Sequence, residues 1–194
     1  MRYFGVTAAL IAMVATGCGR ANPQSEAGQS GGFLLGRSSS GIVKVSLNDG
    51  SVKVLYSNGE DSWWSLGQAV YDHKRNRYYV ADAKASAIMR FDPLTGERVP
   101  MYKGSGPKTS FSVMGLEIMP ECSAVFFVYD WALYRHDIEK DETELLIPRT
   151  EDPIYRCVAD GAGASLYLER KSGVYVLDLK TMQINRVVEG IATL

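Results

Sequence analysis

A hairpin of two apolar strands joined by a polar turn recurs four times along this chain. The copies run from Ile42 to Tyr56, from Ile88 to Tyr102, from Leu133 to Ile147 and from Val174 to Val188. They recur at intervals of roughly 45 residues, which is the length of one four-stranded blade of a β-propeller. This period constrains the fold more strongly than any other feature of the sequence.

Two further β-rich runs, joined by a polar turn, precede each of the last three hairpins. They are Gly67 to Asp72 with Tyr79 to Asp82, Gly115 to Pro120 with Phe127 to Asp130, and Cys157 to Asp160 with Leu166 to Leu168. Such pairs are typical of antiparallel strands. The sequence therefore predicts an all-β fold, a β-propeller of four-stranded antiparallel blades.

The stretch from Gly67 to Gly96 resembles the NHL and YWTD repeats of six-bladed propellers. The positions that match those repeats are Asp72, Tyr79, Asp82, Ile88, Asp92 and Gly96. The resemblance covers most of the chain after residue 32. It implies a fold and no particular activity.

The number of blades depends on how the ends of the propeller are covered. Only Phe33 to Arg37 precedes the first hairpin, so the first blade has three strands and lacks its innermost one. The segment Gly190 to Leu194 is similar to the beginnings of the innermost strands at Gly67 and Gly115. We predict that it pairs with residues 33–56 and closes a four-bladed ring, because closure protects sheet edges. The alternative is a truncated six-bladed propeller.

Residues 1–17 have the features of an export signal. A basic residue is followed by an apolar run from Val6 to Val14 and by small residues before Cys18. The segment Ala15 to Cys18 resembles a bacterial lipobox, which implies cleavage before Cys18 and a lipid on its sulfur. Because Gly19 follows Cys18, this resemblance implies anchoring to the periplasmic face of the outer membrane or to the cell surface.

The chain after the signal divides into two parts. Residues 18–32 are polar and lack periodicity, so we predict a lipidated cysteine followed by a flexible tether. Residues 33–194 form the predicted propeller domain.

The charged residues nearly balance, since 21 are basic and 22 are acidic. Such a surface has no positive field for phosphate backbones, so nucleic acid is not an expected partner. The expected partners are the membrane, through the lipid on Cys18, and a small-molecule ligand or an envelope protein.

Two more cysteines, Cys122 and Cys157, lie in the propeller domain. They can form a disulfide, because exported chains meet oxidising compartments. The alternative is a pair of free thiols buried as small hydrophobic side chains.

Aspartates recur at equivalent strand ends, where their side chains can accept backbone hydrogen bonds and fix turns. They are Asp72, Asp82, Asp92, Asp130, Asp137, Asp160 and Asp178. Because repetition argues for structure, we assign no catalytic role to them. His73 and His136 have no partner at metal-ligand spacing, and hydrolase, phosphate-loop and zinc motifs are absent from the sequence. We therefore predict no metal and no cofactor.

The candidate binding residues are those that break the repeat, and propeller topology brings their loops to one face. They are Trp63, Trp64, Phe111, Trp131, Arg149 and Tyr155. Aromatic rings beside carboxylates, such as Glu60 and Asp61, can stack on a sugar and orient it. Aromatic and arginine side chains also dominate protein–protein interfaces. For the two adjacent tryptophans the alternative is packing between blades.

The sequence thus predicts a non-enzymatic, membrane-anchored extracytoplasmic lipoprotein whose propeller face binds a ligand or an envelope protein. The alternative is a metal-dependent hydrolase similar to six-bladed lactonases. That resemblance would place Glu117 and Asp152 at a metal in the central channel, although the matching asparagines are not evident in the other inner strands.

Overall fold

The computed structural model describes residues 32–38, 40–57, 66–104 and 113–189. Fifteen strands lie in these ranges. They are β1 (Phe33–Ser38), β2 (Gly41–Ser46), β3 (Val52–Tyr56), β4 (Leu66–Asp72), β5 (Arg77–Asp82), β6 (Ala87–Phe91), β7 (Arg98–Lys103), β8 (Val113–Ile118), β9 (Ala124–Tyr129), β10 (Ala132–Asp137), β11 (Glu142–Ile147), β12 (Ile154–Ala159), β13 (Ser165–Arg170), β14 (Gly173–Asp178) and β15 (Ile184–Glu189). The described part of the chain contains no helix long and apolar enough to cross a membrane.

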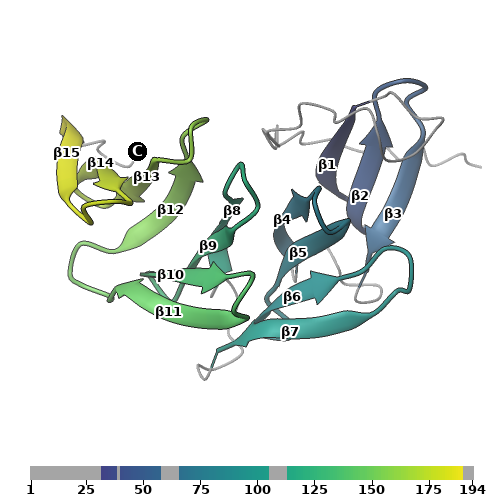
Figure 1. Ribbon diagram of the computed structural model, residues 1–194, viewed down its shortest axis with the longest axis horizontal. Coiled ribbons are helices and arrows are strands. Elements are labelled where there is room, and N and C mark those ends of the chain that lie inside the picture. The colour runs from purple at the N-terminus through teal and green to yellow at the C-terminus, as the bar shows by residue number, and fades with distance from the viewer. Residues whose placement is uncertain (1–31, 39, 58–65, 105–112, 190–194) are drawn as a thin grey trace, which may run out of the picture.

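The strands form four antiparallel sheets in which each strand pairs with the next one along the chain. The first sheet is β1-β2-β3, and the others are β4 to β7, β8 to β11 and β12 to β15. This is a propeller-like arrangement of blades (Figure 1). The all-β prediction is confirmed, as is the three-stranded first blade.

The four repeated hairpins predicted from the sequence share one register. Ile42 pairs with Tyr56, Ile88 with Tyr102, Leu133 with Ile147 and Val174 with Val188. In every hairpin the register shifts immediately after that pair, so the same β-bulge occurs four times. A bulge bends and twists its strand, and its repetition gives the four sheets the same curvature.

The turns of these hairpins are also built alike. Asp92, Asp137 and Asp178 each accept hydrogen bonds at Oδ1 from the backbone N–H groups two and three residues further on. In the first hairpin Ser46 stands at the position of these aspartates. The residue four positions after it, or after the aspartate, has a left-handed backbone in all four turns. The φ angles are 69° at Gly50, 76° at Gly96, 55° at Asp141 and 58° at Met182. The turn interpretation of these aspartates is confirmed.

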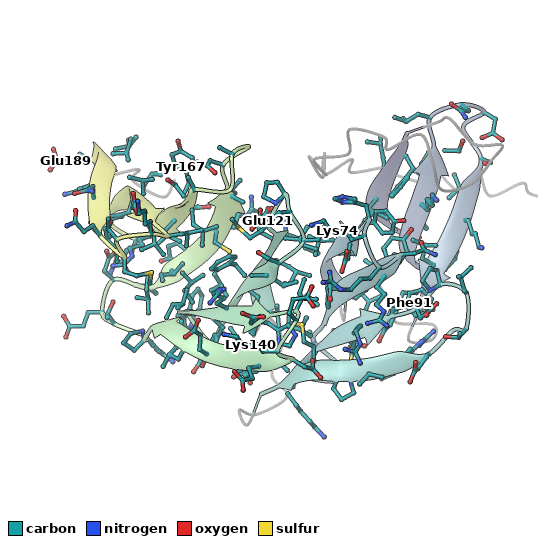
Figure 2. All side chains as sticks on the ribbon, in the orientation of Figure 1. Lys74, Phe91, Glu121, Lys140, Tyr167 and Glu189 are labelled. Atoms are coloured by element: carbon teal, nitrogen blue, oxygen red, sulfur yellow. The ribbon has the colours of Figure 1, made fainter. Side chains whose placement is uncertain are left out.

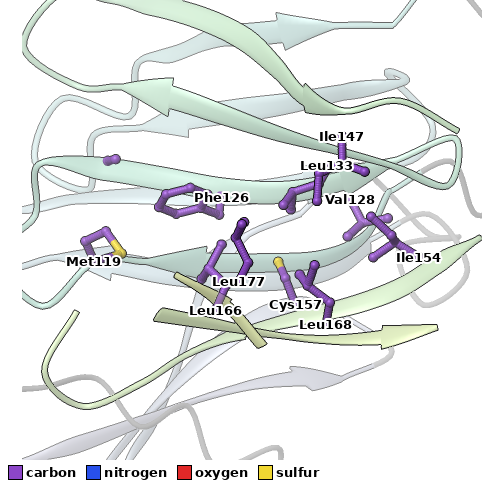
Figure 3. Packing of buried hydrophobic residues seen from close by; sticks show 11 residues of the cluster. Met119, Phe126, Val128, Leu133, Ile147, Ile154, Cys157, Leu166, Leu168 and Leu177 are labelled. Atoms are coloured by element: carbon purple, nitrogen blue, oxygen red, sulfur yellow. The ribbon is translucent and has the colours of Figure 1, made fainter. Parts of the chain in front are cut away.

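Three apolar cores lie between consecutive sheets. The core between the third and fourth sheets is drawn in Figure 3 and includes Phe126, Val128, Leu133, Leu166 and Leu168, all nearly inaccessible to solvent. Each such side chain contributes about 1.5–3 kcal/mol on burial. The stacking of sheet on sheet therefore supplies most of the apolar burial in the fold.

The stacked sheets form an open arc, with the first and fourth sheets at its two ends (Figure 1). Packing joins neighbours along the chain: β1 and β2 lie against β4, β4 and β5 against β8, and β8 and β9 against β12. The segment 190–194, on which the predicted ring closure depends, lies outside the described residues. The blade count therefore stays a prediction.

Of the two alternatives for Cys122 and Cys157, the structure has the pair of free thiols, and both are buried. Cys122 lies in the turn between β8 and β9, with its Sγ 3.2 Å from His73 Nδ1. Cys157 belongs to the core between the third and fourth sheets. The two thiols are therefore buried in separate places, in agreement with the alternative of unpaired cysteines that pack as small side chains.

Candidate functional site

The turn between β9 and β10 differs from the other described strand connections in the backbone of its residues. Tyr129 pairs with Ala132, so the turn consists of Asp130 and Trp131 alone. Both have left-handed backbones, with φ of 46° and 66°. A two-residue hairpin turn of this kind favours Asn-Gly, because a side chain there costs about 1–2 kcal/mol per residue. A tryptophan in this position is a departure that points to a functional role for its side chain.

Trp131 is fixed on the side that faces the fourth sheet. Its ring meets the ring of Tyr155 edge to face, with centroids 5.4 Å apart and an interplanar angle of 83°. Its carbonyl oxygen accepts a hydrogen bond from the N–H of Ile154 at 3.3 Å. The turn between β9 and β10 is thereby tied to the first residues of β12.

An ion pair lies beside these rings. Arg149 Nη1 donates to Asp130 Oδ1 at 3.1 Å, and both side chains are 61% exposed. An exposed pair adds little stability, so its polar atoms remain available to a ligand. We refer to Asp130, Trp131, Arg149 and Tyr155 as the Trp131 cluster.

A second polar cluster lies on the same edge of the fourth sheet, at the turn between β13 and β14. Asp152 accepts at Oδ1 from the Ser172 N–H (2.9 Å) and at Oδ2 from the Ser172 hydroxyl (2.7 Å). That hydroxyl also lies 2.7 Å from the Tyr175 hydroxyl. Burial opposes the charge on Asp152, but the Ser172 hydrogen bonds and nearby Arg170 outweigh it and lower the pKa of this carboxyl.

Two arginines lie against the ring of Tyr175. The guanidinium carbon of Arg170 is 5.2 Å and that of Arg186 is 5.9 Å from the ring centroid. Arg186 also donates to the carbonyl oxygen of Ser172. We refer to Asp152, Arg170, Ser172, Tyr175 and Arg186 as the Ser172 cluster.

The structure brings together three of the residues predicted from the sequence to bind, namely Trp131, Arg149 and Tyr155. The other predicted binding residues, Trp63, Trp64 and Phe111, lie outside the described residues, as does the predicted lipidation site Cys18. Asp130 was expected to fix a turn like the other repeated aspartates. Its side chain instead pairs with Arg149, because the turn is too short to offer N–H groups two and three residues on.

The Ser172 cluster was missed by the sequence analysis. Its members come from the loop before β12, from the turn between β13 and β14, and from strands β13 to β15. The available signal was the concentration of Arg170, Ser172 and Tyr175 around one turn. That signal is weak, because polar residues are common in turns.

The metal site that a lactonase-like hydrolase would need is not present in the described ranges. There, no group of three His, Cys, Asp or Glu side chains comes close enough to hold an ion. Both carboxylate oxygens of Asp152 accept hydrogen bonds from Ser172. Glu117, on β8, is half-buried, and burial raises its pKa to about 7.

A surface hollow of about 350 Å³ lies on the β10–β11 hairpin, at the edge opposite the Trp131 cluster. It is lined by Arg135, Asp137, Lys140, Glu142, Thr143 and Glu144. Four of the five charged side chains in it pair with one another, Arg135 with Asp137 and Glu144, and Lys140 with Asp137. We therefore assign no ligand to this hollow.

Comparisons with solved structures agree on the fold. The chain is similar to the extracellular domain of a proposed one-component system from Bacteroides thetaiotaomicron, with a TM-score of 0.62 and 13% identity over 81% of this chain and 21% of that one. It is similar to an auxiliary nutrient-binding protein from Bacteroides thetaiotaomicron VPI-5482 (TM-score 0.57, 14% identity, 79% and 37% covered). It is also similar to a chain of a nidogen/laminin complex (TM-score 0.62, 14% identity, 81% and 59% covered).

At such identities the likeness concerns the fold alone. The chain spans between about a fifth and three fifths of the length of these structures. No protein-family model matches the sequence, and no curated protein matches it significantly.

Proposed function

We propose that this chain is a non-enzymatic extracytoplasmic binding protein that uses the Trp131 cluster to hold a ligand or an envelope protein partner. The observation that carries the proposal is the position of Trp131. A left-handed backbone, unfavourable for tryptophan, holds this ring against Tyr155 and beside an exposed ion pair. Strain that folding does not need is typical of recognition sites.

The chemistry of the cluster suits recognition. Tryptophan and tyrosine rings offer large, rigid apolar surfaces with a polar group at one end. Arg149 and Asp130 offer planar donors and acceptors next to those rings. Such a surface can stack on a sugar or another ring, and it also resembles the centre of a protein–protein interface.

The comparisons support an extracytoplasmic binding role. Two of the similar structures are described as an extracellular domain and as an auxiliary nutrient-binding protein. A role in binding outside the cytoplasm agrees with the export signal predicted in residues 1–17.

Membrane anchoring through Cys18 is part of the proposal. Replacement of Cys18 by Ser should remove the proposed lipid attachment, so the variant should lack the fatty acid that the wild type carries. Mass spectrometry of the mature N-terminus tests the same point. An unmodified Cys18 in the membrane-bound protein would contradict anchoring by a lipid.

The open arc bears on the blade count. A four-bladed ring closed by the segment 190–194 requires the first and fourth sheets to meet, whereas they stand at opposite ends of the arc (Figure 1). The arrangement favours a ring of more than four sheets. Deletion of residues 189–194 distinguishes a closed four-bladed ring from a ring of more than four sheets, since it should lower Tm sharply only in the closed four-bladed form.

Binding is tested by recovering the tagged protein from membranes of the producing cells and identifying what is bound. We expect Trp131→Ala to abolish recovery of a stoichiometric ligand or envelope protein that the wild type retains. Leu94→Ala is the matched control, because Leu94 is 80% exposed in the β6–β7 turn, at the opposite edge. Equal recovery by Trp131→Ala and the wild type would overturn the proposal.

A further inference from the structure

The polar part of the Trp131 cluster has hydrogen-bonding atoms to spare. Arg149 donates to Asp130 through Nη1, and Asp130 accepts through Oδ1. The other guanidinium N–H groups of Arg149 and Oδ2 of Asp130 bond to no described residue. An arginine has five N–H donors and a carboxylate has two acceptor oxygens. The pair therefore offers donors and an acceptor side by side to a ligand.

The charges around the cluster balance one another. Asp130 and Arg149 neutralise each other, and the loop and turn beside them contribute exposed Glu151 and exposed Lys171, one charge of each sign. Two further ion pairs lie in the Ser172 cluster and at the end of β15, where Glu189 is seen in Figure 2: Arg170 with Asp152 at 3.7 Å and Arg186 with Glu189 at 3.4 Å. An anion would compete with Asp130 for Arg149, and a cation would compete with Arg149 for Asp130. The site therefore favours a ligand without net charge.

The aromatic part of the cluster presents ring surface to solvent. Trp131 and Tyr155 are each only half-buried, and their rings cross at 83°. Rings that meet edge to face do not cover each other as stacked rings do. The face of an aromatic ring carries partial negative charge, so it attracts C–H groups that are polarised by neighbouring oxygen atoms.

The surroundings of the two rings are polar. No large hydrophobic side chain is exposed in the described connections at this edge, which are residues 83–86, 130–131, 148–153 and 171–172. A standard protein–protein interface buries about 800 Å² on each partner and has an apolar centre. Two rings in polar surroundings suit a small ligand better than a protein partner.

The segment that carries Arg149 and leads to Tyr155 is held in place by the Ser172 cluster. Asp152, within this segment, accepts from the N–H and the hydroxyl of Ser172, and its carbonyl oxygen accepts from the Thr150 hydroxyl at 3.0 Å. These bonds fix the segment before any ligand arrives. Such preorganisation lowers the entropic cost of binding.

We propose that the Trp131 cluster binds a neutral pyranose sugar, as one unit of an oligosaccharide. The inference rests on the proposed function and names the class of its ligand. One face of the sugar packs on the ring of Trp131, while adjacent hydroxyl groups donate to Oδ2 of Asp130 and accept from Arg149. A hydroxyl group both donates and accepts, so the ion pair stays intact. The dissociation constant should be about 1 mM, because so small a site contacts few atoms of the ligand.

The probes are neutral oligosaccharides of glucose, galactose, mannose and xylose, titrated into the purified full-length protein. Saturation-transfer difference NMR should detect at least one of them, with the strongest transfer to protons on one face of the sugar. Oligogalacturonate, the anionic counterpart of the galactose series, should bind no more tightly than the neutral oligosaccharide. Tighter binding of oligogalacturonate, or no binding of any neutral oligosaccharide, would overturn the proposal.

Variants place the binding at the Trp131 cluster. Trp131→Asn removes the ring and Arg149→Met removes the guanidinium, and each should weaken binding of the same oligosaccharide at least about tenfold. Trp131→Phe retains an aromatic face and should bind more tightly than Trp131→Asn. Leu94→Ala, in the exposed β6–β7 turn, is the control and should bind like the wild type. Unchanged affinity in folded Trp131→Asn and Arg149→Met would overturn the proposal.

The failure of this ligand class is distinguishable from failure of the site. If no neutral oligosaccharide binds while capture from membranes still depends on Trp131, the ligand class is wrong and the proposed function stands. If capture is also independent of Trp131, the proposed function is wrong as well.

Discussion

The turns at the two ends of the strands differ in their chemistry, and we call these two ends the hairpin edge and the opposite edge of the stack. At the hairpin edge, Asp92, Asp137 and Asp178 make the same turn with the same two backbone hydrogen bonds. At the opposite edge, the Trp131 cluster occurs once and includes a turn that is unfavourable for its residues. The repeated aspartates therefore serve the fold, and the Trp131 cluster, which does not recur, is the place where we expect binding.

The largest expected loss of stability comes from the regular part of the fold. Asp72 is fully buried and pairs with Arg75 at 3.0 Å while holding the β4–β5 turn. Asp72→Ala should lower the free energy of unfolding by about 3 kcal/mol, because the half-buried Arg75 loses this partner and the N–H groups of Lys74 and Arg75 lose their acceptor. Urea unfolding measures the change. Glu144→Ala, which removes an exposed partner of Arg135, is the control and should change stability little.

Glu117 is an exception within the regular part, since it stands where the second and fourth sheets have Val70 and Val158. Its folded pKa of about 7 lies above its ordinary value of 4.5. The folded state therefore binds this proton more tightly than the unfolded state, and stability is lost as pH rises from about 4.5 to about 7.

Glu117→Gln should remove this pH dependence. At pH 8 the variant should be more stable than the wild type by up to about 3 kcal/mol, and below pH 4.5 the two should be alike. Urea unfolding at the two pH values tests this. An equal difference at both would show that charge on Glu117 is not the cause.

The repeated turns are expected to matter less individually. Asp92→Ala should cost about 1 kcal/mol, because the N–H groups of Leu94 and Thr95 lose their acceptor but remain accessible to water. Thermal unfolding measures this loss. Asp92→Asn, which retains an acceptor oxygen, should recover most of it.

The smallest change in stability is expected at the edge where binding is proposed. Trp131→Asn removes the edge contact with Tyr155, worth about 0.5–1.5 kcal/mol, and relieves a left-handed tryptophan at a similar gain. Stability should stay within about 1 kcal/mol of the wild type by urea unfolding. A loss of several kcal/mol would show that Trp131 serves the fold.

The sequence predicted the regular part of this molecule well because its signals recur. The end residues of the hairpins, such as Ile88 with Tyr102, turned out to be paired partners. The grouping of Trp131 with Tyr155 was also predicted, since both belong to connections on one propeller face. The role of Asp130 could not be predicted, because its strand-end position looks like that of Asp82 until the turn length is known.

Other features depended on distances that a sequence does not contain. Nothing in the spacing of Cys122 and Cys157 indicated that one thiol would lie beside His73 and the other in the core between two sheets. Similarly, the hydrogen bonds between Asp152 and Ser172 join residues from a loop and a turn that only the pairing of β12 with β13 brings together.

The central claim is that the function lies in the Trp131 cluster and not in the repeated turns. It is tested most directly by comparing Trp131→Asn with Asp92→Ala in one capture experiment from membranes, using equal amounts of folded protein. The account predicts that Trp131→Asn loses the captured ligand or partner at nearly unchanged stability, whereas Asp92→Ala retains it despite a lower Tm. Retention by Trp131→Asn together with loss by Asp92→Ala would contradict it.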